Sequence, residues 1–230
     1  MGRPRRLALL ALACAAVLPA ACGSSSSSSS KRAAGTGTTA TSTPAGAGPT
    51  QPGGGTLGPE RIPIEQGPSL APASSTSGGT TVDGIQCAPI EQLAYHIHAH
   101  LQVYVNGQSR QLPGGIGLLG PVAQQTPAGP FYGAQKCYYW LHTHTADGVL
   151  HIESPTARVY TLGNFFDEWR QPLSANQVAG HTGHVKAFVN GKPWTANPRD
   201  IPLNLRAQIQ LDVGNPPVPF SGISWAASGL

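Results

Sequence analysis

The strongest constraint on the fold is a ten-residue stretch, from His96 to Val105, in which polar and apolar side chains alternate without a break. Alternation with a period of two is typical of a β-strand with one face in a core, because successive side chains of a strand point to opposite sides of the sheet. The Asn106–Gly107 pair that follows favours a two-residue hairpin turn. The stretch therefore predicts a strand that leads into a hairpin.

Four more segments have the composition of strands, being rich in β-branched and aromatic residues and bounded by turn-forming pairs. They are Tyr138–Thr145, Val149–Glu153 after an Asp147–Gly148 turn, His184–Val189 before an Asn190–Gly191 turn, and Ile209–Val213. One helix is predicted at Leu162–Trp169, with Thr161 as its N-cap, because the large apolar side chains fall on one helical face. We therefore expect an all-β fold, an antiparallel sandwich or small barrel with one short helix.

Residues 23–82 do not have the composition of a folded domain. They consist mainly of Ser, Thr, Gly, Pro and Ala, in a chain of 230 residues that has 29 Gly and 22 Pro in all. A segment with so few large apolar side chains cannot bury enough surface to offset the entropy lost on ordering. We expect residues 23–82 to be a disordered tether and residues 83–230 to be a single domain, since about 150 residues is a common domain size.

Residues 1–22 have the three-part layout of a secretory signal: a basic start, an apolar run from Leu7 to Leu18, and small residues before Cys22. Leu18–Cys22, followed by a glycine and seven serines, resembles the lipobox of bacterial lipoprotein precursors. The resemblance implies that Cys22 becomes the lipidated first residue of the mature protein. It also implies export and anchoring to the cell membrane, facing the periplasm or the cell exterior. The alternative is cleavage to a soluble secreted form.

The formal net charge of +4 does not indicate a nucleic-acid partner. All of the excess lies in residues 1–82, whereas residues 83–230 carry eight basic and eight acidic side chains. A nucleic-acid-binding domain is expected to carry a basic surface on its folded part. We therefore expect no nucleic-acid partner, and the sequence identifies no protein partner.

Two cysteines, Cys87 and Cys137, lie in the predicted domain. An even pair in an exported chain predicts a disulfide, and no C-x-x-C spacing supports the alternative of a thiolate metal site. Closing a loop of about 50 residues stabilises a fold by roughly 4 kcal/mol in the chain-entropy model. The bridge would also tie together two segments that carry histidines.

All eight histidines lie in residues 83–230. In the predicted strand His96, His98 and His100 share one face, and the aliphatic residues between them face the core. Neighbouring members of such a row are about 6.5–7 Å apart at the backbone, which lets two imidazoles converge on one ion.

A second histidine cluster follows from the predicted Asp147–Gly148 turn. A two-residue turn places His144 opposite His151 and His142 opposite Glu153, so that the four side chains share one face. Three imidazoles and a carboxylate match the ligands of zinc, copper and non-haem iron sites, whereas the alternative is a metal-free polar face. The predicted metal ligands are His96, His98, His100, His142, His144, His151 and Glu153.

The kinds of ligand narrow the choice of ion. The only methionine is Met1, in the signal, and the domain cysteines are predicted to be paired. A methionine-rich Cu(I) carrier and a blue-copper centre are therefore disfavoured. Imidazole and carboxylate suit Cu(II), Zn(II), Ni(II) or Fe(II), and we expect a divalent transition metal, copper or zinc.

These features are compatible with three functions. We favour a membrane-anchored lipoprotein whose β domain binds the metal for capture, buffering or delivery. The first alternative is a metal-dependent enzyme in which a His/Glu-ligated ion activates water. The second is a metal-free binding module for a cell-envelope partner. No nucleophile motif such as G-x-S-x-G is present, and no catalytic residue is predicted.

Overall fold

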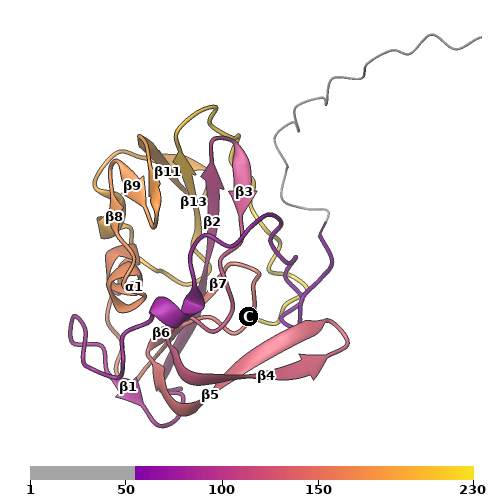
Figure 1. Ribbon diagram of the computed structural model, residues 1–230, viewed down its shortest axis with the longest axis vertical. Coiled ribbons are helices and arrows are strands. Elements are labelled where there is room, and N and C mark those ends of the chain that lie inside the picture. The colour runs from indigo at the N-terminus through magenta and orange to yellow at the C-terminus, as the bar shows by residue number, and fades with distance from the viewer. Residues whose placement is uncertain (1–54) are drawn as a thin grey trace, which may run out of the picture. The chain divides into compact units, whose positions relative to one another are not determined.

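The structure is a computed structural model that describes residues 55–230 (Figure 1). The predicted signal peptide, Cys22 and the first part of the predicted tether lie outside these residues. The strands of the largest sheet are β2 (Tyr95–Val105), β3 (Gln108–Arg110), β6 (Leu141–His142), β7 (Val149–Ser154), β11 (Val185–Val189), β12 (Lys192–Trp194) and β13 (Gln208–Val213). They lie in the order β12–β11–β13–β2–β7–β6, with β3 paired to β2 as well.

Two smaller sheets accompany the large one. Their strands are β1 (Cys87–Ala88), β4 (Leu118–Thr126) and β5 (Gly129–Tyr139) in the first, and β8 (Leu173–Ser174), β9 (Gln177–Val178) and β10 (His181–Thr182) in the second. Short 3-10 turns occur at Ala73–Ser75 and Pro198–Asp200. Within residues 55–230, no helix has the length and apolar character that crossing a membrane requires.

The predicted all-β fold with one short helix and antiparallel sheets is confirmed. One pairing differs from the antiparallel prediction, because β13 runs parallel to β2 along its whole length. The alternation of side chains in β2 indicates a strand but not the direction of its neighbour, which depends on how the chain returns to the sheet.

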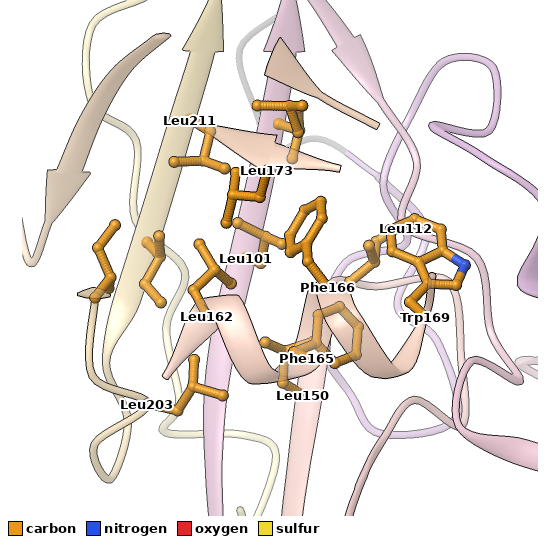
Figure 2. Close-up of a cluster of buried hydrophobic side chains, with 14 of the residues drawn as sticks. Leu101, Leu112, Leu150, Leu162, Phe165, Phe166, Trp169, Leu173, Leu203 and Leu211 are labelled. Carbon is orange, nitrogen blue, oxygen red and sulfur yellow. The ribbon is translucent and has the colours of Figure 1, made fainter. Parts of the chain in front are cut away.

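The one α-helix, α1 (Leu162–Glu168), begins where the sequence predicts. The Thr161 hydroxyl accepts a hydrogen bond from the Asn164 backbone, and the Asn164 side chain accepts one from the Thr161 backbone, which completes a capping box. The apolar face of α1 packs on the large sheet and forms the main core with it (Figure 2). Side chains from both sides of this contact are Leu101, Leu150, Leu162, Phe165, Phe166, Trp169 and Leu211.

Both predicted Asn-Gly turns are present. Asn106–Gly107 joins β2 to β3, and Asn190–Gly191 joins β11 to β12. All four residues have positive φ angles, between 50° and 79°, as a type I′ turn requires. The sequence therefore predicted these two hairpins correctly.

The two faces of β2 differ in chemistry but not in burial. Its aliphatic side chains lie in the main core, as predicted. On the other face His98, His100, Gln102 and Tyr104 are also buried. This polar face is therefore enclosed, and its groups need partners inside the protein.

The prediction of a disordered tether does not hold for residues 55–82. Ile62 is fully buried and Leu70 is 4% exposed. The backbone of this segment bonds to the rest of the fold, for example from Glu65 N–H to the Ala146 carbonyl. Low apolar content misled the prediction because a few well-placed side chains, with backbone bonds supplied by the domain, are enough to order a segment. We call residues 55–72 the N-terminal strap.

The hairpin predicted between residues 138 and 153 has a different register. The observed pairs are His142 with His151 and Leu141 with Ile152, two residues away from the predicted alignment of His144 with His151. Residues 143 and 144 instead bond through their carbonyl groups to Gly115 N–H and Tyr132 N–H. A shift of two residues leaves every side chain on its predicted face, because the strand period is two.

The predicted disulfide joins Cys87 of β1 to Cys137 of β5, with a Cα–Cα distance of 5.3 Å. It closes a loop whose ends are 50 residues apart in the sequence. Tyr139 lies two residues after Cys137 in β5, and its backbone oxygen contacts Nδ1 of His142, one of the predicted ligands.

Candidate metal centre

Strands β6, β7 and β2 lie side by side and bring the predicted ligands to one face of the sheet. Their register places His142 opposite His151, and His151 opposite His98, so that these three form a row across the sheet. Glu153 lies opposite His96 in the next row. Residues separated by two positions along a strand share a face, and cross-strand partners lie about 5 Å apart. The tertiary pairing therefore gathers histidines that are 44 to 55 positions apart in the sequence.

Two sets of potential ligands result. The first set, His142, His144, His151 and Glu153, is wholly buried, and its four ligand atoms lie within 4.8 Å of one another. The second set comprises His96, His98 and His151, with ligand atoms equally close. We call His142 and His144 the inner pair, and His96 and His98 the outer pair.

The inner pair is held by backbone carbonyl groups. His142 Nδ1 lies 2.9 Å from the Tyr139 oxygen, and His144 Nδ1 lies 2.6 Å from the Tyr132 oxygen. A carbonyl oxygen only accepts hydrogen bonds, so both Nδ1 atoms must be the donors. The proton of each neutral imidazole is then on Nδ1, and each Nε2 carries a lone pair. Fixing the ring through the other nitrogen is the usual way in which proteins orient a metal-binding histidine.

The two Nε2 atoms of the inner pair face each other at 3.1 Å. Two lone pairs at this distance repel unless a cation or a proton lies between them. Two Zn–N bonds of 2.0–2.1 Å that meet at about 100° place their nitrogen atoms about 3.1 Å apart. The spacing is therefore that of two ligands of one ion.

The surroundings keep the inner pair in its neutral, ligand form. Burial, together with the neighbouring imidazoles, lowers the pKa of His142 well below its usual value and that of His144 to about 4. The His144 ring also stacks on Phe131, with the ring centres 4.4 Å apart. A metal ion at this place does not have to displace protons from these two side chains near neutral pH.

The outer pair repeats this arrangement nearer the surface. His96 Nε2 and His98 Nε2 lie 3.0 Å apart. Burial and the proximity of His151 lower the pKa of His98 to about 3. The side chain of His96 is 37% exposed, so the outer pair is open to solvent where the inner pair is not.

His151 lies between two carboxylates. Its Nδ1 is 3.2 Å from Glu153 Oε1, and its Nε2 is 2.6 Å from Glu60 Oε1. Burial opposes a charge on this ring, but the hydrogen bonds to Glu153 and Glu60 outweigh it and raise the pKa of His151 to about 9. Without a metal, the ring is an imidazolium that joins the two carboxylates.

Sequence reasoning missed Glu60, because this residue falls in the segment that composition assigned to the tether. The N-terminal strap carries it into the cluster, where its second oxygen accepts a hydrogen bond from the Thr145 hydroxyl at 2.9 Å. The available signal was weak: Glu60 is one of only two acidic residues among residues 1–82, and the other, Glu65, is buried too. A buried acid in a nearly uncharged segment implies a specific partner.

His100 is the one predicted ligand that the structure does not bring into either set. Its Nε2 bonds to the Asp147 carbonyl oxygen at 2.9 Å, and its ring faces Trp225 edge-on. The residue shares a strand face with the outer pair, but it lies further along β2, opposite Val149 at the end of the β7 pairing. Its surroundings are those of a buried, hydrogen-bonded histidine.

A further carboxylate lies at the opening of the cluster. Glu91 Oε1 is 3.5 Å from His144 Nε2, and its side chain is 35% exposed. The adjacent Ile90 and Leu93 are exposed as well. A metal-free binding module would need exposed aromatic side chains for its partner, but four large aromatic residues of the domain are half-buried and none of them is exposed: Tyr138, Trp140, Trp194 and Trp225.

The fold and the site define a class: a β-sheet domain with a buried histidine and glutamate cluster that could hold a metal ion. No protein-family model, curated protein or solved structure matches the chain. The chemistry of the site therefore carries the functional argument.

Proposed function

We propose that the chain is an exported, lipid-anchored protein whose β domain binds a divalent transition metal, copper or zinc, for capture, buffering or delivery. The observation that carries the proposal is the inner pair: two buried Nε2 atoms 3.1 Å apart, each on a ring whose Nδ1 donates to a carbonyl group. Glu153 supplies an adjacent carboxylate, and one of its oxygens, Oε2, is buried without a hydrogen-bond partner. An ion at this place satisfies all three groups.

The donor atoms favour copper or zinc. Imidazole nitrogen and carboxylate oxygen suit Cu(II) and Zn(II), while a Cu(I) carrier would use thioether or thiolate sulfur. The domain cysteines are joined in a disulfide, and the chain has no methionine after Met1. Geometry alone does not separate the two ions, so the metal content decides between them.

A surplus of ligands favours binding and transfer over catalysis. Five imidazoles and the carboxylates of Glu60, Glu91 and Glu153 lie around one cluster, more than a four-coordinate ion uses. Exchange of an ion is easier when incoming ligands are already in place. The exposed outer pair offers a route from solvent to the buried set.

Export and anchoring rest on residues 1–22 and on the disulfide. Disulfides form and persist in oxidising compartments, which include the periplasm and the cell exterior. Cys22→Ala tests the anchor: we expect the variant protein to move from the membrane fraction to the soluble fraction or to remain uncleaved. Retention of a processed protein in the membrane fraction would contradict lipidation at Cys22.

The metal assignment is tested with the full-length protein, extracted from its native compartment with detergent and without a histidine tag. Elemental analysis should find at least one equivalent of copper or zinc. The variant with His142→Gln and His144→Gln should lose it. His100→Gln should keep the metal, because it replaces a buried histidine of β2 that belongs to neither set of candidate ligands. A metal-free wild-type protein, or no loss in the double variant, would overturn the assignment.

A second candidate function is metal-assisted hydrolysis. The observation in its favour is Glu91, a half-exposed carboxylate 3.5 Å from His144 Nε2 at the opening of the cluster, where it could take a proton from a metal-bound water. The metal-loaded protein should then hydrolyse activated esters, and Glu91→Gln should slow the reaction by about 100-fold or more without loss of metal. Equal rates for the two proteins would exclude this role.

A further inference from the structure

We propose that the cluster holds two metal ions, one at the inner pair and a second at the outer pair, with the Glu153 carboxylate bridging them. This inference rests on the proposed function and extends it from one ion to a two-ion site. Each pair consists of histidines two positions apart, and each points two Nε2 atoms at one place.

The two pairs have the same internal geometry. The Nε2 atoms are 3.0 Å apart in the outer pair and 3.1 Å apart in the inner pair. The ring centres are 4.6 Å and 4.7 Å apart, and both ring pairs are T-shaped. The outer pair therefore has the same Nε2 spacing, that of two ligands of one ion.

One ion cannot serve both pairs. Ligands of a single zinc or copper ion lie at most about 4.2 Å apart, twice the metal–nitrogen distance. The outer pair and the inner pair fall into two separate sets of mutually close ligand atoms, and only His151 belongs to both. Its ring centre lies 4.6 Å from that of His98 and 4.5 Å from that of His144, about midway between the pairs.

Glu153 has the position of a bridging ligand. Its Oε1 lies 3.1 Å from His96 Nε2 in the outer pair, and its Oε2 lies 3.9 Å from His142 Nε2 in the inner pair. One oxygen of the same carboxylate thus faces each pair. The oxygen on the inner side is buried and has no hydrogen-bond partner in the structure. A buried carboxylate oxygen is costly to leave unpaired, and a cation at the inner pair would satisfy it.

The cluster carries enough carboxylates to accommodate two divalent ions. Glu60 and Glu153 are buried beside His151, and Glu91 adds a third carboxylate at the opening. Three carboxylates offset most of the charge of two divalent ions.

The two sites differ in access to solvent. The inner pair is buried, whereas His96 of the outer pair is 37% exposed on its side chain. We therefore assign the outer pair as the place where an ion enters and leaves, and the inner pair as the place where it is retained. Glu153 and His151, which contact both sides, connect the two.

The test uses the full-length protein, stripped of metal with a chelator and titrated with Cu(II). Native mass spectrometry should show two equivalents in the wild-type protein and in His100→Gln. It should show one equivalent in the variant with His96→Gln and His98→Gln. The single variant His96→Gln changes an exposed side chain and should still fold, with the second equivalent bound at least about tenfold more weakly.

Electron paramagnetic resonance then tests the bridge. Two Cu(II) ions joined by a carboxylate couple magnetically, so the loaded wild-type protein should give a reduced integrated signal and a half-field transition. The outer-pair double variant should give the full signal of an isolated Cu(II) ion.

The remaining outcomes separate failure of the proposed function from failure of the second metal site. No bound metal in the wild-type protein would overturn the proposed function itself. One equivalent in the wild-type protein would leave that function in place and overturn the second site. Two equivalents in the outer-pair double variant would overturn the assignment of its ligands, and two uncoupled ions would overturn the Glu153 bridge.

Discussion

At the scale of single residues, the site depends on groups whose charge is set by burial. His151 joins Glu60 and Glu153 as an imidazolium, whereas burial keeps the inner pair neutral. The cluster therefore contains both a protonated and two neutral histidines. The difference arises because carboxylates face both nitrogens of His151, while the inner pair meets carbonyl groups and other imidazoles.

Glu60→Gln should destabilise the metal-free protein at pH 7. Its carboxylate helps to raise the pKa of His151 from 6.5 to about 9, a contribution that is fully present below pH 6.5 and is lost as the pH rises through about 9. Breaking a buried ion pair of this kind costs about 3 kcal/mol. Urea unfolding should show this loss at pH 7 and a smaller one above pH 9. Glu91→Gln, at a half-exposed position, should change stability much less, and equal effects of the two variants would contradict the assignment.

Glu65→Gln should remove a loss of stability that the wild-type protein shows in a lower pH range. Burial, with the nearby Asp147 charge, raises the pKa of Glu65 well above its usual value, so the folded protein retains a proton that the unfolded chain releases. Wild-type stability should then fall as the pH rises from about 4.5 toward the folded-state pKa, by at most about 1.4 kcal/mol per pH unit for this group. The amide can still accept the hydrogen bond from Leu112 N–H. Urea unfolding from pH 5 to 8 should show the variant gaining stability relative to wild type, and a constant difference would refute this.

At the scale of elements, the strap is the segment whose character composition misjudged. It contributes a buried apolar side chain at Ile62, an acid to the histidine cluster at Glu60, and a second buried acid at Glu65. The hairpins and the helix were predictable because their signals lie in neighbouring residues: an Asn-Gly pair, a capping box, a period of two. The strap has no such local signal, since its order depends on partners supplied by β7 and by the segments around residues 111 and 146.

Ile62→Ala tests whether the strap is part of the folded unit. The side chain is fully buried, so its truncation should cost about 2–4 kcal/mol in urea unfolding of the metal-free protein. Leu57→Ala is the matched control in the same segment, because Leu57 is 48% exposed and should cost less than about 1 kcal/mol. If the strap were the disordered tether that its composition suggests, both changes would be nearly neutral.

At the scale of the whole molecule, metal binding and folding should be linked. The candidate ligands come from β2, β6, β7 and the segment that follows β6, and Glu60 of the strap bonds to one of them, so the site exists only when these elements are assembled. An ion that binds the folded state alone stabilises it by an amount that grows with the ratio of free ion to the dissociation constant. The disulfide between β1 and β5 limits the motion of the chain near the same site.

Saturating Zn(II) should therefore raise the free energy of unfolding by about 2.7 kcal/mol at a free concentration 100 times the dissociation constant. A chelator should reverse the gain. The variant with His142→Gln and His144→Gln keeps only the outer pair and should gain clearly less stability, whereas His100→Gln should respond as the wild-type protein does. Equal stabilisation of the inner-pair variant would show that zinc acts elsewhere on the chain.

The amino-acid sequence alone determined strands β2, β7, β11 and β13, the two Asn-Gly turns, the helix with its cap, and the faces on which the histidines lie, because each of these depends on residues close together in the chain. The tertiary structure decided which histidines meet. It moved the partner of His151 from His144 to His142, left His100 bonded to a carbonyl group, and brought Glu60 in from a segment that looked disordered. Convergence on an ion depends on strand register and on the carbonyl groups that fix each ring, and neither is encoded by local spacing.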